Sequence, residues 1–460
     1  MSDLFSSLTS AVRALDAQRA GLDATGQNIA NVNTPGYSRR IVDFSAVPPY
    51  VKWSAGNGVE VTGIRAQRDI LIERRLRQET TSERKQAAIA DGLRVVETAL
   101  GTAGSSLDAN LSALFDAFQT LAEEPTSAIA RAQVQVEAQS LATAFHNIAS
   151  RIQTARLDTD TQVGGIVDEI NSLAGRIRTL NGTIASAPTP ADALTPQDEQ
   201  NELVRQLSEL ADVTVLQRAD GGVDISIGSG RPLVVGNYDY PVSTTLGVGG
   251  MKQLQTGGFD ITDEIGGGTL GGLLQIRDVD IPAHLTQLDQ LAYDVVQEIN
   301  AVHATGYDQT GTAAGAFFSF STPPVGVAGA ASAIELDAAI AADGRLIGAA
   351  GIPQAGDNTV ARQLAGLRDV RVASGGTATM SEAWAQLVYR VGRDTRNAET
   401  EQTSRAEIVN QVTTLRDQVS GVSLDEEAAM MLRFQRAYEA NARFFRAIDE
   451  TLSLLMQTVA

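Results

Sequence analysis

Residues 4–29 read LFSSLTSAVRALDAQRAGLDATGQNI, and this stretch decides the fold that we predict. Apolar and small residues recur there in alternating steps of four and three, which is the spacing of one face of a coiled-coil helix. The positions of this seam are Leu4, Leu8, Ala11, Leu15, Gln18, Leu22, Thr25 and Ile29. We expect the helix to end at Thr34-Pro35-Gly36, because proline disfavours helix in the residue before it and glycine permits a turn.

The last helix of the chain has the same kind of seam. It carries Phe434, Tyr438, Asn441, Phe445, Ile448, Leu452, Leu455 and Val459 in the same steps. A helix of about 30 residues is roughly 45 Å long and cannot bury such a stripe alone. We therefore predict that the two chain ends pair as a coiled coil, with the middle of the chain looped out. The alternative is that each end packs on its own neighbours within one globule.

Helical and extended segments alternate between the two ends. From Ile64 to about Ala185 we expect three long helices, separated at Gly101–Ser106 and at Gly164-Gly165. A further helix over Gln200–Leu210 leads into short β-branched runs with glycines between them, which predict antiparallel hairpins. Before these helices we expect short extended pieces over 37–64, around Pro48-Pro49 and Gly56-Asn57-Gly58, and we expect a linker at Pro188–Pro196. Helix should resume at about Gly272 and stop before Gly306, followed by a β or loop segment over 307–355. The final region should be helical, with a break at Gly421.

This order of elements predicts an α+β multidomain fold in three parts. Each part is discontinuous in sequence, because the paired ends enclose everything else. The ranges are 1–36 with 424–460 for a terminal coiled-coil assembly domain, 37–210 with 273–305 and 356–423 for a long helical rod, and 211–272 with 306–355 for a β-rich outer insertion.

Composition excludes several classes of function. The chain has 460 residues, a net charge of −19 and no cysteine. The negative charge argues against nucleic acid or a membrane surface as partner. Without cysteine there are no disulfides, thiolate nucleophiles or cysteine-based metal sites. The first 30 residues lack the pattern of a cleaved secretory signal, and no apolar run approaches the ~18 residues of a membrane span.

No residue pattern favours catalysis or cofactor binding. His146, His284 and His303 are scattered without metal-ligand spacing, and we expect the first two to be surface or capping residues. Gly266–Gly271 formally matches G-x-G-x-x-G, but we interpret it as a flexible start of a helix. The basic stretch after Arg65 alternates with carboxylates, so we expect a solvated or subunit-contacting helix with i, i+4 pairs such as Arg65 with Asp69. We predict no catalytic, cofactor-binding or metal site.

Motifs at both ends resemble a known family. Asn28-Ile-Ala-Asn-Val-Asn-Thr-Pro-Gly-Tyr-Ser-Arg-Arg40 resembles the N-terminal signature of bacterial flagellar axial proteins of the rod, hook and hook-associated group. Leu424–Arg443, which reads LDEEAAMMLRFQRAYEANAR, is similar to the matching C-terminal signature. In the interior, Leu111–Arg131 and Ile299–Gly311 with the following Phe317-Phe318 resemble the hook-associated protein 1 family, with weaker support from Gly271–Asp278 and Gly356-Asp-Asn358.

The resemblance implies a structural adapter that joins the flagellar hook to the filament. It implies export without a cleaved signal peptide to the extracellular flagellum, and no cofactor. The implied partners are the hook protein, the second hook–filament junction protein, copies of this chain in a ring, the export apparatus, and an export chaperone at the C-terminal helix. The residues expected at subunit interfaces are Leu4, Leu8, Leu15, Leu22, Asn28, Ile29, Asn31, Gly36, Tyr37, Phe434, Tyr438, Phe445, Ile448, Leu452 and Leu455.

Three other functions remain open at this point. The nearest is another flagellar axial subunit, such as the hook or distal rod protein. The second is a secreted enzyme carried on flagellar-type ends, with a hydrolase within Val213–Ala355. The third is a cytoplasmic coiled-coil scaffold, which would form a stable soluble homo-oligomer.

Overall fold

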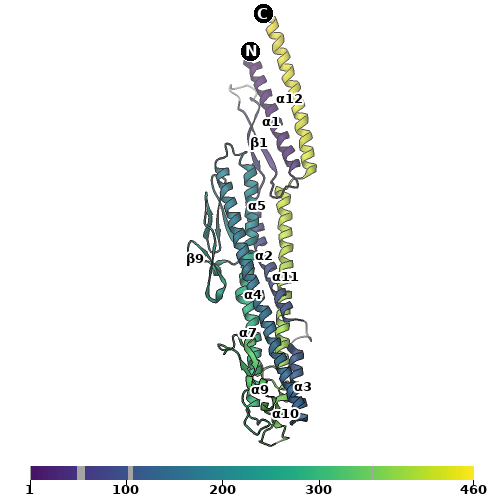
Figure 1. Cartoon of the computed structure of the whole chain (residues 1–460). Helices are drawn as coiled ribbons and strands as arrows, with labels where there is room; N and C mark the ends of the chain where they lie inside the picture. The colour runs from purple at the N-terminus through teal and green to yellow at the C-terminus, as the bar shows by residue number, and fades with distance from the viewer. Residues whose placement is uncertain (1, 49–56, 102–106, 355, 460) are drawn as a thin grey trace.

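The protein is long and narrow, and both chain ends lie at the same end of it (Figure 1). The structure is a computed structural model that describes residues 2–48, 57–101, 107–354 and 356–459. The helices are α1 (Ser2–Ala30), α2 (Ile70–Leu100), α3 (Leu107–Glu123), α4 (Ala128–Ala185), α5 (Leu194–Leu210), α6 (Gly268–Gln275), α7 (Ile281–His303), α8 (Ala330–Ala333), α9 (Ala338–Ala342), α10 (Thr359–Gly366), α11 (Met380–Ser420) and α12 (Leu424–Val459). The strands are β1 (Arg40–Ala46), β2 (Val59–Ala66), β3 (Val213–Gln217), β4 (Val223–Ile227), β5 (Arg231–Val235), β6 (Tyr238–Asp239), β7 (Ser243–Leu246), β8 (Lys252–Thr256), β9 (Phe259–Asp260), β10 (Phe318–Phe320) and β11 (Ile334–Leu336).

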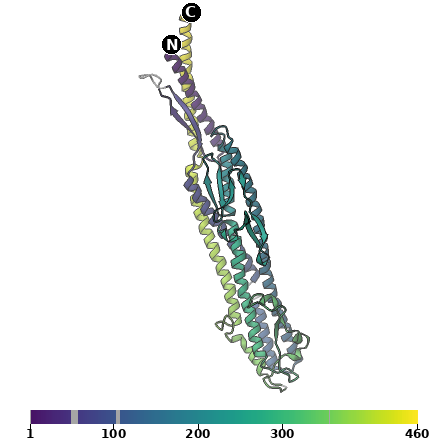
Figure 2. The ribbon, with the colours of Figure 1, turned by 90° about the vertical axis from the view of Figure 1, so that its left-hand side faces the viewer.

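The two terminal helices lie side by side, as the seams predict. α1 and α12 run along one another at the top of Figure 1, and the view turned by 90° in Figure 2 shows the same pairing. The antiparallel hairpin of β1 and β2 packs beside α1, with Arg40 paired to Ala66 and Ala46 to Val59. The predicted fold class, with paired terminal helices, a helical rod and a smaller β insertion, is therefore confirmed.

The rod is a bundle in which α2, α4, α7 and α11 run along the long axis (Figure 1). α2 and α11 pack closely along their lengths, and α3, α7 and α10 add to the lower end. The apolar face of α3 is fully buried there, with the rings of Phe118 and Phe317 5.3 Å apart. One continuous hydrophobic core thus joins segments that lie some 200 residues apart in sequence.

The first β segment packs against the upper half of the rod. β3, β4, β5 and β6 form an antiparallel sheet in that order, and β7, β8 and β9 form a second sheet. Alternate residues of β4, namely Val223, Ile225 and Ile227, are buried against α4 and α5, as period-2 alternation predicts for a half-buried strand. The hairpins expected from the β-branched runs lie at these positions.

The second β segment lies elsewhere. Residues 306–354 form loops, three very short helices and the β10–β11 hairpin, and they pack into the lower core with α3 and α7. The sequence expectation grouped this segment with 211–272 in one outer domain, whereas the two segments here belong to different hydrophobic clusters. Short apolar runs in a sequence do not say which core they join.

Helix boundaries in the rod differ from those predicted. Gly164-Gly165 does not interrupt α4, which continues for 58 residues; a Cβ on Gly164 would lie 3.2 Å from Cε of Lys252, so glycine makes room for that side chain. The break falls instead before α4, where the Ser127 hydroxyl caps the new helix. α2 begins at Ile70 because Asp69 caps it, after β2 has run on to Ala66. Of the expected breaks and turns, Pro49, Gly56 and residues 102–106 lie outside the described residues.

The glycine motif at 266–271 serves close helix packing. Gly268 has a φ of +68°, and a Cβ there would lie 2.4 Å from the backbone nitrogen of Ala211. A Cβ on Gly272 would lie 2.5 Å from the carbonyl oxygen of Lys85. The glycines therefore allow α6 to approach the end of α5 and the side of α2, which is a packing role at the start of a helix.

Two histidines are buried, and for His284 the surface expectation is wrong. His284 is 4% exposed because α7 turns it toward α11. His303 is fully buried, and its ring stands edge-on to Phe317. The N–H of Gly348 donates to Nε2 of His303 at 2.8 Å, and Nδ1 lies 2.8 Å from the carbonyl oxygen of Gly315. Since a carbonyl only accepts, Nδ1 carries the proton and the ring is neutral.

Acid is expected to weaken this lower core through His303. Burial lowers the pKa of His303 below its ordinary value, and nearby Arg131 acts in the same direction. The hydrogen bond to the Gly315 carbonyl and the charge of Asp337 oppose this shift but do not cancel it. The unfolded chain therefore binds a proton that the folded chain excludes, and stability falls as pH drops below about 6.5. We expect the free energy of unfolding to fall by about 1 kcal/mol more between pH 7 and 5.5 in the wild type than in His303→Gln, measured by denaturant unfolding. An equal pH dependence in both proteins would contradict this assignment.

Candidate functional site

Small residues of α1 allow α12 to approach it closely. Ala17 and Ala24 of α1 are buried, and between them Gly21 lies against the ring of Phe434. A Cβ on Gly21 would lie 2.6 Å from Cε1 of that ring. The same ring lies 6.3 Å, between centroids, from that of Phe44 on β1. Phe434 thus fills the space between α1 and the hairpin, and any larger residue at position 21 would displace it.

The residues predicted for the seam are brought together, but a single chain covers only part of them. Leu4, Leu8, Leu15, Leu22, Ile29, Phe434, Phe445 and Leu452 are half-buried, and Ile448 is buried. Tyr438 and Leu455 remain about 40% exposed. Further apolar side chains on the two helices point outward: Phe5, Val12, Leu432, Phe444, Leu454 and Met456. The terminal pair therefore presents apolar surface that one copy of the chain cannot cover.

Asn28 is the centre of the joint between the terminal pair and the hairpin. Its side chain is buried and makes four hydrogen bonds. Nδ2 donates to the carbonyl oxygen of Arg40 and to Oε2 of Glu427, each at 3.0 Å. Oδ1 accepts from the backbone N–H of Arg40 at 2.7 Å and from the Tyr37 hydroxyl at 2.8 Å. Because both donors and both acceptor positions of the amide are used, no other side chain of this size fits its place.

Glu427 connects α12 to the same joint. Its carboxylate is 2% exposed, and besides Asn28 it accepts from Nε of Arg39 at 2.7 Å. Arg39 also pairs with Glu426 at 3.0 Å, and its backbone N–H donates to the carbonyl oxygen of Ser420 at the end of α11. The signature after α1 therefore holds both the C-terminal helix and the end of the rod.

Asp198 at the start of α5 ties the joint to the rod. Its carboxylate accepts from the guanidinium groups of Arg40 and Arg68. Nε of Arg68 also donates to the Ser38 hydroxyl at 2.7 Å. Burial raises the pKa of Asp198, and the two arginines oppose that shift. Arg40 and Asp198 together thus form a buried ion pair, which needs its geometry intact to compensate for desolvation.

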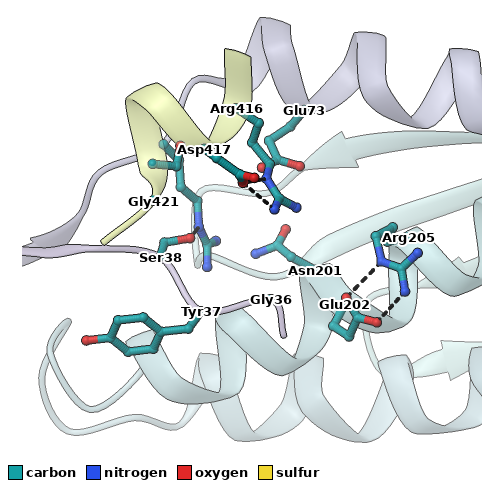
Figure 3. A pocket seen from close by; sticks show the side chains of 12 residues that line it. Gly36, Tyr37, Ser38, Glu73, Asn201, Glu202, Arg205, Arg416, Asp417 and Gly421 are labelled. Carbon is teal, nitrogen blue, oxygen red and sulfur yellow. Dashed lines mark hydrogen bonds and ion pairs between the residues drawn. The ribbon is translucent and has the colours of Figure 1, made fainter. Parts of the chain in front are cut away.

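A polar pocket lies between this joint, the middle of α5 and the end of α11 (Figure 3). Gly36, with a φ of +78°, and Tyr37 form one side, and Arg416 and Asp417 of α11 form the other. Figure 3 shows Glu202 and Arg205 of α5 bonded to each other at the edge. The lining holds guanidinium and carboxylate groups in about equal number, and these neutralise one another. Within the described part of the chain, no cluster of three metal-binding residues occurs and no helix could span a membrane.

Asn31 has a local role. Its Nδ2 donates to the carbonyl oxygen of Gln27, and its Oδ1 accepts from the Thr34 hydroxyl. These bonds shape the turn that ends at Gly36. Asn31 thus contributes to the turn and takes no part in the hydrogen bonds of Asn28.

Several residues of the joint were missed by sequence reasoning. Glu427 lies seven residues before Phe434 and therefore on the same face of α12. A single carboxylate among the apolar residues of this seam could have indicated a buried polar contact. Arg65 contacts Asp43 at 3.0 Å, so the expected pairing with Asp69 is wrong, because Asp69 caps α2. Arg68, assigned to a solvated or subunit-contacting helix, binds Asp198 within the chain. No local pattern connects residues 130 positions apart.

Known proteins share these features. Residues 8–37 match the family model described as flagella basal body rod protein, and 417–458 match that of the flagellar basal body rod FlgEFG protein C-terminal region. Residues 93–318 match the flagellar hook-associated protein FlgK helical domain. Flagellar hook-associated protein 1 of Bacillus subtilis is 28% identical over 500 residues, which cover 98% of each chain. The chain is therefore similar to proteins named flagellar hook-associated protein 1 along almost its whole length.

A second relative and a solved structure are also similar to this chain. Flagellar hook-associated protein 1 of Escherichia coli is 23% identical and covers 98% of this chain and 99% of its own. The solved structure of the flagellar hook junction protein FlgK from Burkholderia pseudomallei superposes with a TM-score of 0.68 at 16% identity, over 75% of this chain and 100% of that chain. The two rod-type matches coincide with α1 and α12, so the flagellar signatures lie on the terminal pair and its joint.

Replacing Asn28 should loosen the terminal pair from the rod. In Asn28→Ala the Glu427 carboxylate and both Arg40 backbone groups lose a partner, which costs about 1–3 kcal/mol for each buried group left unpaired. We expect hydrogen exchange to accelerate in α1 and α12 and to stay unchanged in α4. Asn31→Ala, which removes only turn contacts, serves as the control. Equal protection of the terminal helices in Asn28→Ala and wild type would contradict the role assigned to Asn28.

Proposed function

We propose that the protein is a structural adapter of the bacterial flagellum, located at the junction between hook and filament and required for filament attachment. The observation that carries this proposal is the combination within one chain of two axial-type ends and an interior that matches the hook-associated helical domain. The relatives that carry the name flagellar hook-associated protein 1 span nearly the whole chain. The role proposed is mechanical and not catalytic.

The half-covered terminal pair supports assembly into an array. In the single chain, apolar side chains such as Phe5, Phe444 and Met456 are more than half exposed. Burial of apolar surface is worth about 25 cal/mol per Å², so stacking of terminal pairs against one another stabilises an assembly. In a head-to-tail array each interface joins two different surfaces, so one side can meet the hook and the other the next junction protein.

The remaining partners are proposed from the same surface. Copies of this chain would form a ring, with the terminal pairs inside and the β sheets outside. Before export, the exposed stripe near the end of α12 would be held by an export chaperone, since an unpaired apolar stripe promotes aggregation. Export through the flagellar apparatus, without a cleaved signal peptide, would deliver the chain to the extracellular flagellum, and the absence of cysteine suits refolding there.

Another axial subunit, such as the hook or distal rod protein, is the second candidate. The matches at 8–37 and 417–458 to rod-type families favour it, because these ends alone do not separate the axial proteins. The match over 93–318 favours the junction.

Deletion of the gene in the source bacterium should separate these candidates. We expect hooks without filaments in electron micrographs and flagellin in the culture medium, because the hook lacks the surface on which a filament begins. Complementation with the intact gene is the control. Absence of hooks would move the assignment to the hook or rod, and intact filaments would overturn the proposed function.

Charging the open stripe of α12 should prevent assembly. Leu452 is half-buried against the terminal pair and Leu455 is 43% exposed, so Leu452→Glu with Leu455→Glu places charge on the stripe. We expect loss of both chaperone binding and filament attachment, with the melting temperature of the rod unchanged, measured by pull-down, microscopy and calorimetry. Leu246→Glu, on the exposed strand β7, is the control. Normal filaments in the double variant would overturn the role of this stripe.

A further inference from the structure

A groove of about 740 Å³ runs between α2 and the first sheet. Arg74, Arg77, Gln78, Thr81 and Ser82 of α2 form one wall. The other wall is formed by residues 212–216, with glycines 228, 266 and 267 at its end. Neither the terminal pair nor the joint described above contributes to this groove.

The groove faces the edge of a strand. Successive side chains of a strand point to opposite faces, so a wall that includes four consecutive residues of β3 is formed by the strand edge and not by one face. β3 is the end strand of its sheet, which has the order β3-β4-β5-β6. In the described part of the chain, the backbone of β3 forms hydrogen bonds only in its ladder with β4. An open edge of this kind is a template for pairing with another strand.

The groove also carries uncompensated positive charge. Among the described residues, the side chains of Arg74 and Arg77 make no hydrogen bond and no ion pair within 4 Å, although Glu73 lies near Arg77. Arg77 is half-buried, so its guanidinium has lost part of its water. Oδ1 of Asp212, beside the same edge, is buried and has no hydrogen-bond partner among the described residues. An extended segment with a carboxylate would pair with the two guanidinium groups.

The chain itself presents a strand of that chemistry. β2 pairs on one side with β1, and on its other side its backbone makes no hydrogen bond with any described residue. Glu60, Val61 and Thr62 of β2 are all exposed, and the Glu60 carboxylate forms no ion pair in the described part of the chain. The outer edge of β1 is not free at Arg40, because the backbone N–H and carbonyl of Arg40 are hydrogen-bonded to the side chain of Asn28. β2 is thus the free edge of the hairpin.

We propose that the edge of β2 of a second copy pairs with β3 in this groove, with Glu60 of that copy against Arg74 and Arg77. Because the edges of β2 and β3 are different surfaces, the contact is head-to-tail. Each copy pairs through β2 with one neighbour and through β3 with the other. About five residues on each side match, from 59 to 63 and from 213 to 217. The inference rests on the array of copies proposed above and assigns one of its lateral contacts.

Cross-linking tests the pairing directly, because the chain has no native cysteine. Flagella are isolated from cells expressing Thr62→Cys with Thr214→Cys and treated with a short bifunctional maleimide. We expect a ladder of linked chains on immunoblots. Thr62→Cys with Thr244→Cys is the control, since Thr244 is also exposed but lies on β7 of the other sheet. Assembled flagella that give no ladder with the first pair, or an equal ladder with both, would overturn the proposal.

Charge reversal gives a second readout. Arg77→Glu should reduce filament-bearing cells about tenfold, and Glu60→Arg in the same chain should restore them. Arg75→Glu, whose side chain is exposed and outside the groove, should have little effect. Full assembly of Arg77→Glu would overturn the strand pairing while leaving the junction function intact. Filaments in the deletion strain would overturn the function itself, so the two failures can be told apart.

Discussion

The buried amide of Asn28 is the contact on which the arrangement of this protein depends. It bonds the hairpin through Arg40 and the last helix through Glu427, so residues 399 positions apart must meet before its hydrogen bonds are complete. A buried amide left unpaired is costly, which makes this contact selective for one geometry. With the two ends held together in this way, the chain between them must run away from the joint and return to it. Both termini therefore lie at the same end of a long rod.

Stability is distributed unevenly along the molecule. The lower rod has a large core in which Phe118, Phe145 and Phe317 are fully buried. The terminal pair, in contrast, consists of two helices and a hairpin with many half-exposed apolar residues. Regions with few buried apolar contacts open at low free energy. The terminal pair therefore has the most stability to gain from further apolar contacts.

Sequence patterns predicted some levels of this structure well and others poorly. The heptad seams gave the pairing of α1 and α12, because hydrophobic periodicity reports directly on a buried face. They did not reveal that the ring of Phe434 packs against Gly21. A glycine in a helix can indicate either a close packing contact or merely a low helix propensity, and the sequence does not distinguish the two. Gly164-Gly165 was wrongly predicted to interrupt α4, because tertiary packing overrides propensities of about 1 kcal/mol. The ion pairs of Asp198 were not predictable, because no local signal joins it to Arg40 and Arg68.

The kind of interaction at the joint bears on how the protein could carry force. The connection between terminal pair and rod includes the ion pairs of Asp198 with Arg40 and Arg68 and of Glu427 with Arg39. Apolar contacts are non-directional, so a purely hydrophobic joint would slide with little change in energy. Buried ion pairs add little net stability but lose much when one partner moves away. A joint built on buried ion pairs therefore resists reorientation strongly, although these pairs contribute little to the free energy of folding. These ion pairs therefore oppose a change in the angle between the terminal pair and the rod.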